Sequence, residues 1–66
     1  MEIRRLRTQA NLTQMEVATA MQVDRSTVSY WERGIAMPRA EQLPKLADLF
    51  GCTIDALFGR ESKDTA

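Results

Sequence analysis

The 66-residue chain contains no histidine and one cysteine, Cys52. A single cysteine excludes an intrachain disulfide and fits a protein kept in a reducing compartment. The chain also lacks a cluster of metal ligands and a glycine-rich phosphate loop, which are usual elements of enzyme sites. We therefore expect no catalytic residue, no metal and no cofactor. Cys52 is expected to be an inert small residue between two helices rather than a redox sensor.

Long apolar runs are also missing from the sequence. No stretch approaches the roughly 20 apolar residues of a membrane span. The N-terminal segment MEIRRLRTQA is charged and does not resemble a signal peptide. We expect a cytoplasmic protein with no membrane partner, and a length of 66 residues allows one domain.

A capping-box pattern predicts that a helix starts after Thr13. The Thr13 hydroxyl can accept a bond from the backbone three residues later, where the Glu16 carboxylate can reach back. The predicted helix covers residues 14–21. Its apolar positions recur at the spacing of one helix face and are Val17, Ala18 and Met21.

A second helix is predicted over residues 25–33, directly after a tight turn. Asp24 is a good N-cap, and Gly34 is a good left-handed C-cap. Val28 and Trp31 lie on one face of this helix, so Trp31 is expected in the core rather than stacked on a base. The opposite face carries polar donors: Arg25, Ser26, Ser29, Tyr30 and Arg33.

At these residues the chain resembles the lambda-repressor-like, or Xre-type, helix-turn-helix family of phage and bacterial regulators. The resemblance runs from Ile3 to about Phe58. It implies an all-α, compact five-helix DNA-binding domain with the helix-turn-helix at its second and third helices. The matching elements are the LTQ opening at Leu12 to Gln14, Ala18, Val28, and the Glu32-Arg33-Gly34 ending with Pro38.

Two positions depart from the family pattern. Gln22 stands at a turn position usually filled by glycine, and a left-handed non-glycine residue there costs about 1 kcal/mol. Pro44 falls within the expected fourth helix, where an interior proline is unfavourable but a first-turn proline is tolerated. We therefore predict that the fourth helix begins near Leu43.

Apolar spacing predicts three further helices outside this motif. The first covers residues 2–10 with Asn11 as a left-handed C-cap, and the last is capped by Thr53. A single domain is expected over residues 1–58, followed by a polar and disordered tail over residues 59–66. The apolar positions of the three helices are Ile3, Leu6 and Ala10, then Leu43, Leu46, Ala47 and Phe50, then Ile54, Leu57 and Phe58.

The polar face of the second motif helix is the candidate DNA surface, since an α-helix fits the major groove. A similar stripe also occurs on ordinary solvated helices, but the surrounding motif favours DNA. Arg25 is the main candidate for reading a base, because a guanidinium can donate two hydrogen bonds to guanine. By position, the resemblance assigns base contacts to Arg25, Ser26, Ser29 and Tyr30. Phosphate contacts are expected from Thr13, Gln14 and Arg33.

Charge is balanced overall, because nine basic and nine acidic residues cancel. Residues 1–39 hold six arginines and four acidic residues, a net charge of +2. The remaining residues hold three basic and five acidic residues, a net charge of −2. The motif lies in the basic half, where DNA phosphates are attracted, and the weak overall charge should limit non-specific binding.

Two further pairs of residues have structural roles in the prediction. Glu32 is expected to form an ion pair with Arg7, as the matching residues of the family often do, instead of repelling DNA. One recognition helix reads only a few base pairs, so we expect a homodimer on an inverted repeat. Leu57 and Phe58 are the candidate dimer interface, and the alternative is that both simply close the core.

The sequence thus predicts a sequence-specific regulator of transcription that binds double-stranded DNA. Repression by covering a promoter is the expected mode of action. The alternative is a protein-binding module, such as a DNA-binding antitoxin that grips a partner protein. The tail lacks the apolar anchors of a partner-binding helix, which favours the stand-alone regulator.

Overall fold

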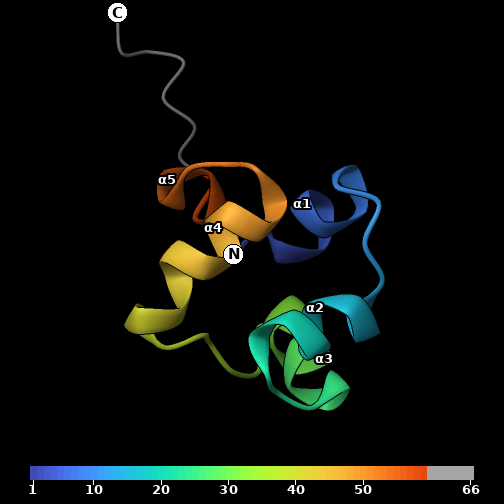
Figure 1. The fold of residues 1–66 in the computed structure, drawn as a ribbon. Helices are drawn as coiled ribbons and strands as arrows, with labels where there is room; N and C mark the ends of the chain where they lie inside the picture. The colour runs from blue at the N-terminus through green and yellow to red at the C-terminus, as the bar shows by residue number, and fades with distance from the viewer. Residues whose placement is uncertain (60–66) are drawn as a thin grey trace, which may run out of the picture.

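The computed structural model describes residues 1–59, which form five α-helices, one 3-10 turn and no strand (Figure 1). This confirms the predicted all-α, five-helix architecture. No helix in this part of the chain is long and apolar enough to cross a membrane. The disordered tail was predicted over residues 59–66, and residues 60–66 of it lie outside the described residues. The elements are α1 (Ile3–Gln9), α2 (Gln14–Met21), α3 (Arg25–Arg33), η1 (Ala40–Gln42), α4 (Leu43–Phe50) and α5 (Ile54–Leu57).

The helices form two neighbouring groups joined by α1. Helices α2 and α3 pack against each other, and α5 packs on α4 (Figure 1). Helix α1 contacts both α3 and α4, so it connects the two groups. Helix α2 also contacts α4 directly, so both α1 and α4 support the helix-turn-helix pair.

Helix α2 begins and ends where the sequence predicts. The Thr13 hydroxyl accepts a bond from the Glu16 amide at 3.0 Å, and the Glu16 carboxylate accepts one from the Thr13 amide at 2.8 Å. This capping box satisfies backbone donors that a helix N-terminus otherwise leaves open. At the other end, Gln22 adopts the left-handed conformation with φ 60° and ψ 44°. The turn thus keeps the geometry that glycine usually supplies, at a cost of about 1 kcal/mol.

Helix α3 has the predicted bounds, but its N-terminus differs in detail. Asp24 has the extended backbone of an N-cap, yet its side chain makes no capping hydrogen bond. The Thr27 amide bonds instead to the Asp24 carbonyl oxygen at 2.9 Å. Asp24 is therefore the N-cap residue, as predicted, although its carboxylate does not take part in the cap. Gly34 ends the helix with φ 78°, as expected.

Helix α4 begins at Leu43 and places Pro44 in its first turn, which confirms the predicted start. A first-turn residue has no helical partner for its amide, so proline loses no hydrogen bond there. The preceding turn η1 was not predicted. It is closed by the Arg39 amide, which donates to the Gln42 side-chain oxygen at 2.8 Å.

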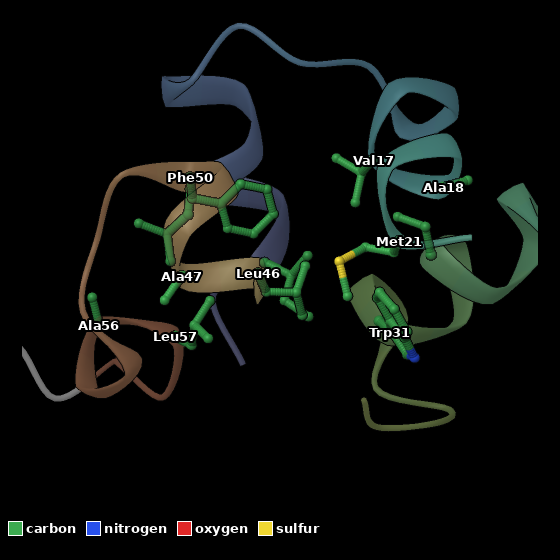
Figure 2. Close-up of a cluster of buried hydrophobic side chains, with 12 residues drawn as sticks. Val17, Ala18, Met21, Trp31, Leu46, Ala47, Phe50, Ala56 and Leu57 are labelled. Carbon is green, nitrogen blue, oxygen red and sulfur yellow. The ribbon is translucent and has the colours of Figure 1, made fainter. Parts of the chain in front are cut away.

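Twelve buried apolar side chains form one core between the two helix groups (Figure 2). Trp31 is 4% exposed, which confirms that it packs in the core. Ala56 also belongs to the core, although apolar spacing within a short helix did not single it out. Cys52 is half-buried and packs against this core between α4 and α5. The core residues are Ile3, Leu6, Val17, Ala18, Met21, Val28, Trp31, Leu46, Ala47, Phe50, Ala56 and Leu57.

Helix α5 corrects one predicted interface residue. Leu57 has no exposed surface, and its carbonyl oxygen accepts a hydrogen bond from the Glu2 amide at 2.8 Å. The Leu57 side chain therefore closes the core of this domain and has no surface to offer a partner. Phe58 differs, because 44% of its surface is exposed. Only Phe58 of the predicted pair remains a candidate for dimer contact.

Candidate nucleic-acid interface

Helix α3 presents one polar face to solvent and packs the other against the core. Arg25, Ser26, Tyr30 and Arg33 are exposed, whereas Ser29 is half-buried. Val28 and Trp31, on the opposite face, are buried in the core. The fold thus places four of the five polar residues on an open helix surface of the kind that enters a major groove.

Tyr30 and Arg33 lie together near the C-terminal end of this surface. The Arg33 guanidinium carbon lies 5.4 Å from the centre of the Tyr30 ring, within the range of a cation–π contact. Residues three apart on a helix are neighbours, which explains the contact. The contact limits the positions open to both side chains while leaving both exposed.

The predicted ion pair between α1 and α3 is present. The Arg7 guanidinium binds the Glu32 carboxylate through Nε, and its Nη1 donates to the Leu12 carbonyl oxygen at 2.8 Å. The two side chains are only 13% and 5% exposed. Glu32 is therefore neutralised inside the protein, and it does not present a free negative charge to DNA.

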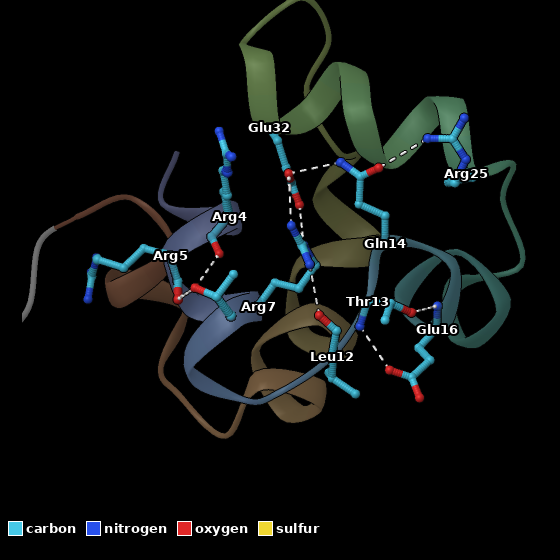
Figure 3. Close-up of polar contacts among 10 residues, drawn as sticks. Arg4, Arg5, Arg7, Leu12, Thr13, Gln14, Glu16, Arg25 and Glu32 are labelled. Atoms are coloured by element: carbon cyan, nitrogen blue, oxygen red, sulfur yellow. Dashed lines mark hydrogen bonds and ion pairs between the residues drawn. The ribbon is translucent and has the colours of Figure 1, made fainter.

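Gln14 extends this pair toward the start of α3 (Figure 3). Its Nε2 donates to Glu32 Oε1 at 3.0 Å, while its Oε1 accepts a bond from Arg25 Nη1 at 3.1 Å. A continuous line of polar contacts therefore runs from Arg7 to Arg25. We call these four residues, Arg7, Glu32, Gln14 and Arg25, the polar line.

Within the polar line, the Arg7–Glu32 pair was predicted from the sequence, but the two bonds of Gln14 were not. Gln14 and Arg25 are the first residues of α2 and α3, and the motif brings these helix starts together. Spacing along the chain contains no signal for this contact, since it depends on how the two helices pack. Arg25 remains exposed, and a guanidinium has five donors, so one bond to Gln14 leaves others for DNA.

The three residues predicted to contact phosphate differ in how many of their polar groups are already hydrogen-bonded within the protein. The Thr13 hydroxyl and amide both take part in the capping box. The Gln14 side chain is occupied by Glu32 and Arg25. Arg33 is exposed, with its guanidinium beside Tyr30. The phosphate contacts of all three remain predictions.

Acidic and sulfur ligands do not gather anywhere in the described part of the chain. Within residues 1–59, no group of three or more cysteine, aspartate or glutamate side chains could hold a metal ion. The polar groups of the candidate surface are mainly arginines, a tyrosine and serine hydroxyls. Such groups donate hydrogen bonds to phosphates and base edges.

A helix-turn-helix family model matches residues 3–57. The chain belongs to the helix-turn-helix family, of the lambda-repressor-like (Xre) type. The two relatives described next are named as a transcriptional activator and a transcriptional regulator, both of the helix-turn-helix type. This helix-turn-helix domain places its motif in α2 and α3, as the resemblance implied.

Two curated relatives are similar over most of this helix-turn-helix domain. The HTH-type transcriptional activator BcrR of Enterococcus faecalis is 38% identical over 60 residues, which are 91% of this chain and 29% of BcrR. The HTH-type transcriptional regulator AnsR of Bacillus subtilis (strain 168) is 40% identical over 62 residues, which are 92% of this chain and 53% of AnsR. The chain thus spans under a third of one relative and about half of the other. No solved structure gives a significant match.

Proposed function

We propose that this helix-turn-helix domain recognises a specific sequence in double-stranded DNA by placing α3 in the major groove. The observation that supports it best is the exposed Arg25 guanidinium at the start of α3, oriented by Gln14. Arg25 reads a guanine in this proposal, while Ser26, Ser29 and Tyr30 contact neighbouring base edges or phosphates. Thr13, Gln14 and Arg33 lie along the flanking backbone and set the position of the helix.

The proposal includes a homodimer on an inverted repeat, because one helix reads too few base pairs for a selective site. Phe58 is its best-supported contact, with 44% of its surface exposed on the domain face formed by α5. Ile54, the first residue of α5, is 40% exposed, and Phe58 follows the last residue of that helix. A two-fold axis near α5 would bring these side chains together with their copies.

Repression is the proposed mode of action, and the cytoplasm is the proposed location. A dimer of small domains can block a promoter by covering it. The name of BcrR describes that relative as an activator, so the two modes need a direct comparison. A reporter placed behind the selected site should lose expression when the protein is produced, whereas increased expression would reverse the proposal.

Selection from random duplex DNA at a stated salt concentration tests sequence recognition. Wild type should enrich an inverted repeat, and Arg25→Ala should relax preference at one position in each half-site with a loss of about 1–3 kcal/mol. Arg33→Ala is the comparison, because loss of a phosphate contact should weaken all sequences similarly. Equal losses of both variants on selected and random duplexes would contradict the assignment of Arg25 to a base.

The same selection separates DNA recognition from the protein-binding alternative. Absence of enrichment by wild type, together with co-purification of a second protein in equal amounts, would favour a module that binds a partner protein. An enriched site bound by the isolated chain would favour the stand-alone regulator.

Sedimentation of the free protein and of its DNA complex tests the dimer. Phe58→Ser should shift the equilibrium toward monomer, because it removes apolar surface from the proposed contact. Met15→Ser is the matched control, since Met15 is an apolar side chain on α2 with 56% exposure. A wild-type monomer in both samples would rule out the dimer.

A further inference from the structure

A hollow of about 220 Å³ lies where α1, the start of α2 and the C-terminal half of α3 meet. Its lining is polar, and three of its residues are arginines. The hollow borders the exposed surface of α3 through Ser29 and Arg33. The lining residues are Arg4, Arg7, Gln14, Ser29, Glu32 and Arg33.

The charges in this hollow do not cancel. Arg7 and Glu32 form the buried ion pair, so their charges neutralise each other. The Glu32 carboxylate also accepts a bond from Gln14, which leaves it little capacity to repel an anion. Arg4 and Arg33 remain, and within residues 1–59 no carboxylate pairs with either of them. The hollow therefore has a net positive charge of about two, supplied by two exposed guanidinium groups.

The two neighbouring arginines of α1 differ in direction and in partners. Arg5 points away from α3 (Figure 3). Its Nε pairs with the Glu2 carboxylate at 3.2 Å. Arg4 points toward the side of the domain that carries Glu32 and α3 (Figure 3). One turn of α1 thus sends one arginine to the candidate DNA side and the next to a carboxylate elsewhere.

We propose that Arg4 and Arg33 together hold one backbone phosphate of the bound duplex in this hollow. This inference rests on the proposed DNA binding and adds Arg4, which lies outside the helix-turn-helix, to the contact surface. Guanidinium groups bind phosphate oxygens through charge-assisted, often bidentate hydrogen bonds. The phosphate is held near the C-terminal half of α3, so it sets the angle of the helix whose other end carries Arg25.

Binding of fluorescent duplexes to Arg4→Gln and Arg5→Gln tests the proposal. Both variants lose one positive charge from the same helix, so a difference between them reports position rather than net charge. Arg4→Gln should weaken binding to the selected duplex and to a random duplex by about tenfold, the size of one charge-assisted hydrogen bond. Its plot of log affinity against log salt should become shallower by about 0.9 per protomer, the value for one phosphate contact. Arg5→Gln should retain nearly the wild-type salt slope.

Two further measurements complete the test. Both variants should unfold at the wild-type temperature, since Arg4 and Arg5 are exposed, and Arg4→Lys should restore the salt slope. In the selected duplex, single phosphates are replaced by neutral methylphosphonates one at a time. One replacement should weaken the wild type clearly more than it weakens Arg4→Gln, which keeps only the Arg33 contact to that phosphate.

The outcomes separate this site from the proposed function. Binding by wild type with equal effects of Arg4→Gln and Arg5→Gln would overturn the phosphate site alone. Equal sensitivity of wild type and Arg4→Gln at every methylphosphonate position would overturn it as well. Failure of wild type to bind either duplex would overturn the proposed function together with this site.

Discussion

The inner face of α3 carries Val28 and Trp31, which are 0% and 4% exposed, whereas its outer face carries Tyr30, which is 42% exposed. Nine residues of one helix thus serve two different purposes. The inner face contributes apolar burial to folding, and the outer face leaves polar donors in solvent. Stability and DNA binding should therefore respond to different substitutions, although the residues involved are neighbours in the chain.

The largest difference in stability is expected between substitutions of Trp31 and Tyr30, which are adjacent in the chain and lie on the two faces of α3. Trp31→Ala should lower the free energy of unfolding by about 3–5 kcal/mol, because it removes a buried aromatic side chain from the core. Tyr30→Ala should cost less than about 1 kcal/mol, the scale of its exposed contact with Arg33. Urea denaturation followed by circular dichroism measures both values. Similar losses for the two variants would mean that the inner and outer faces of α3 contribute equally to stability.

The next effect concerns the ion pair that fixes α3 to α1. Arg7→Ala and Glu32→Ala should each lower the free energy of unfolding by about 3 kcal/mol, since each leaves the other charge buried without its partner. The double variant should cost less than the two single variants together, and a double-mutant cycle gives this coupling.

The exposed pair of Arg5 and Glu2 is the control for that cycle. Its side chains are 42% and 45% exposed, so its coupling should stay below about 1 kcal/mol. Equal coupling in the two cycles would show that burial does not strengthen the pair of Arg7 and Glu32.

A smaller effect, on DNA affinity, is expected at Gln14, which connects the buried ion pair to the exposed Arg25. Gln14→Ala removes the acceptor that holds Arg25, so it should weaken binding to the selected site by about 1 kcal/mol. The part of this loss that acts through Arg25 should disappear when Arg25 is already alanine, and only the proposed phosphate contact of Gln14 should then remain. Gln9→Ala, a change of an exposed glutamine on α1, is the matched control and should leave binding unchanged. Additive losses from Gln14→Ala and Arg25→Ala would show that the two residues act independently.

The smallest difference is expected between the N-caps of the two motif helices. Thr13→Ala should reduce stability by about 1 kcal/mol, because it breaks the capping box of α2. Asp24→Ala should reduce the free energy of unfolding by only a few tenths of a kcal/mol, since the Asp24 side chain makes no capping bond. Thermal unfolding of both variants at equal concentration measures the difference. Equal losses would show that the Asp24 carboxylate caps α3 in solution.

The bounds of α2 and α3 were predictable because their signals are local. Thr13 and Glu16 lie within one turn of helix, and Gly34 occupies a left-handed backbone position beside the last turn. The inner position of Trp31 follows from helix periodicity alone. The exposed polar residues of α3 were predictable for the same reason.

Other features depend on packing between segments that are far apart in sequence. The spacing of Leu57 does not show whether its side chain closes the core or faces a partner. Its burial depends on how the short helix α5 rests on α4 and how the N-terminus bonds to it. The missing side-chain cap at Asp24 also depends on backbone geometry that composition does not specify.

By itself, the sequence determined the helices of this domain, the two faces of α3 and the family to which it belongs, because caps and periodicity act within one or two turns. Only the tertiary structure decided which polar side chains meet. It joined Arg25 to Gln14 and Gln14 to Glu32, and it placed Arg4 beside the hollow that Arg33 also lines. These contacts arise from the angles at which three short helices pack, and no residue spacing within a single helix specifies those angles.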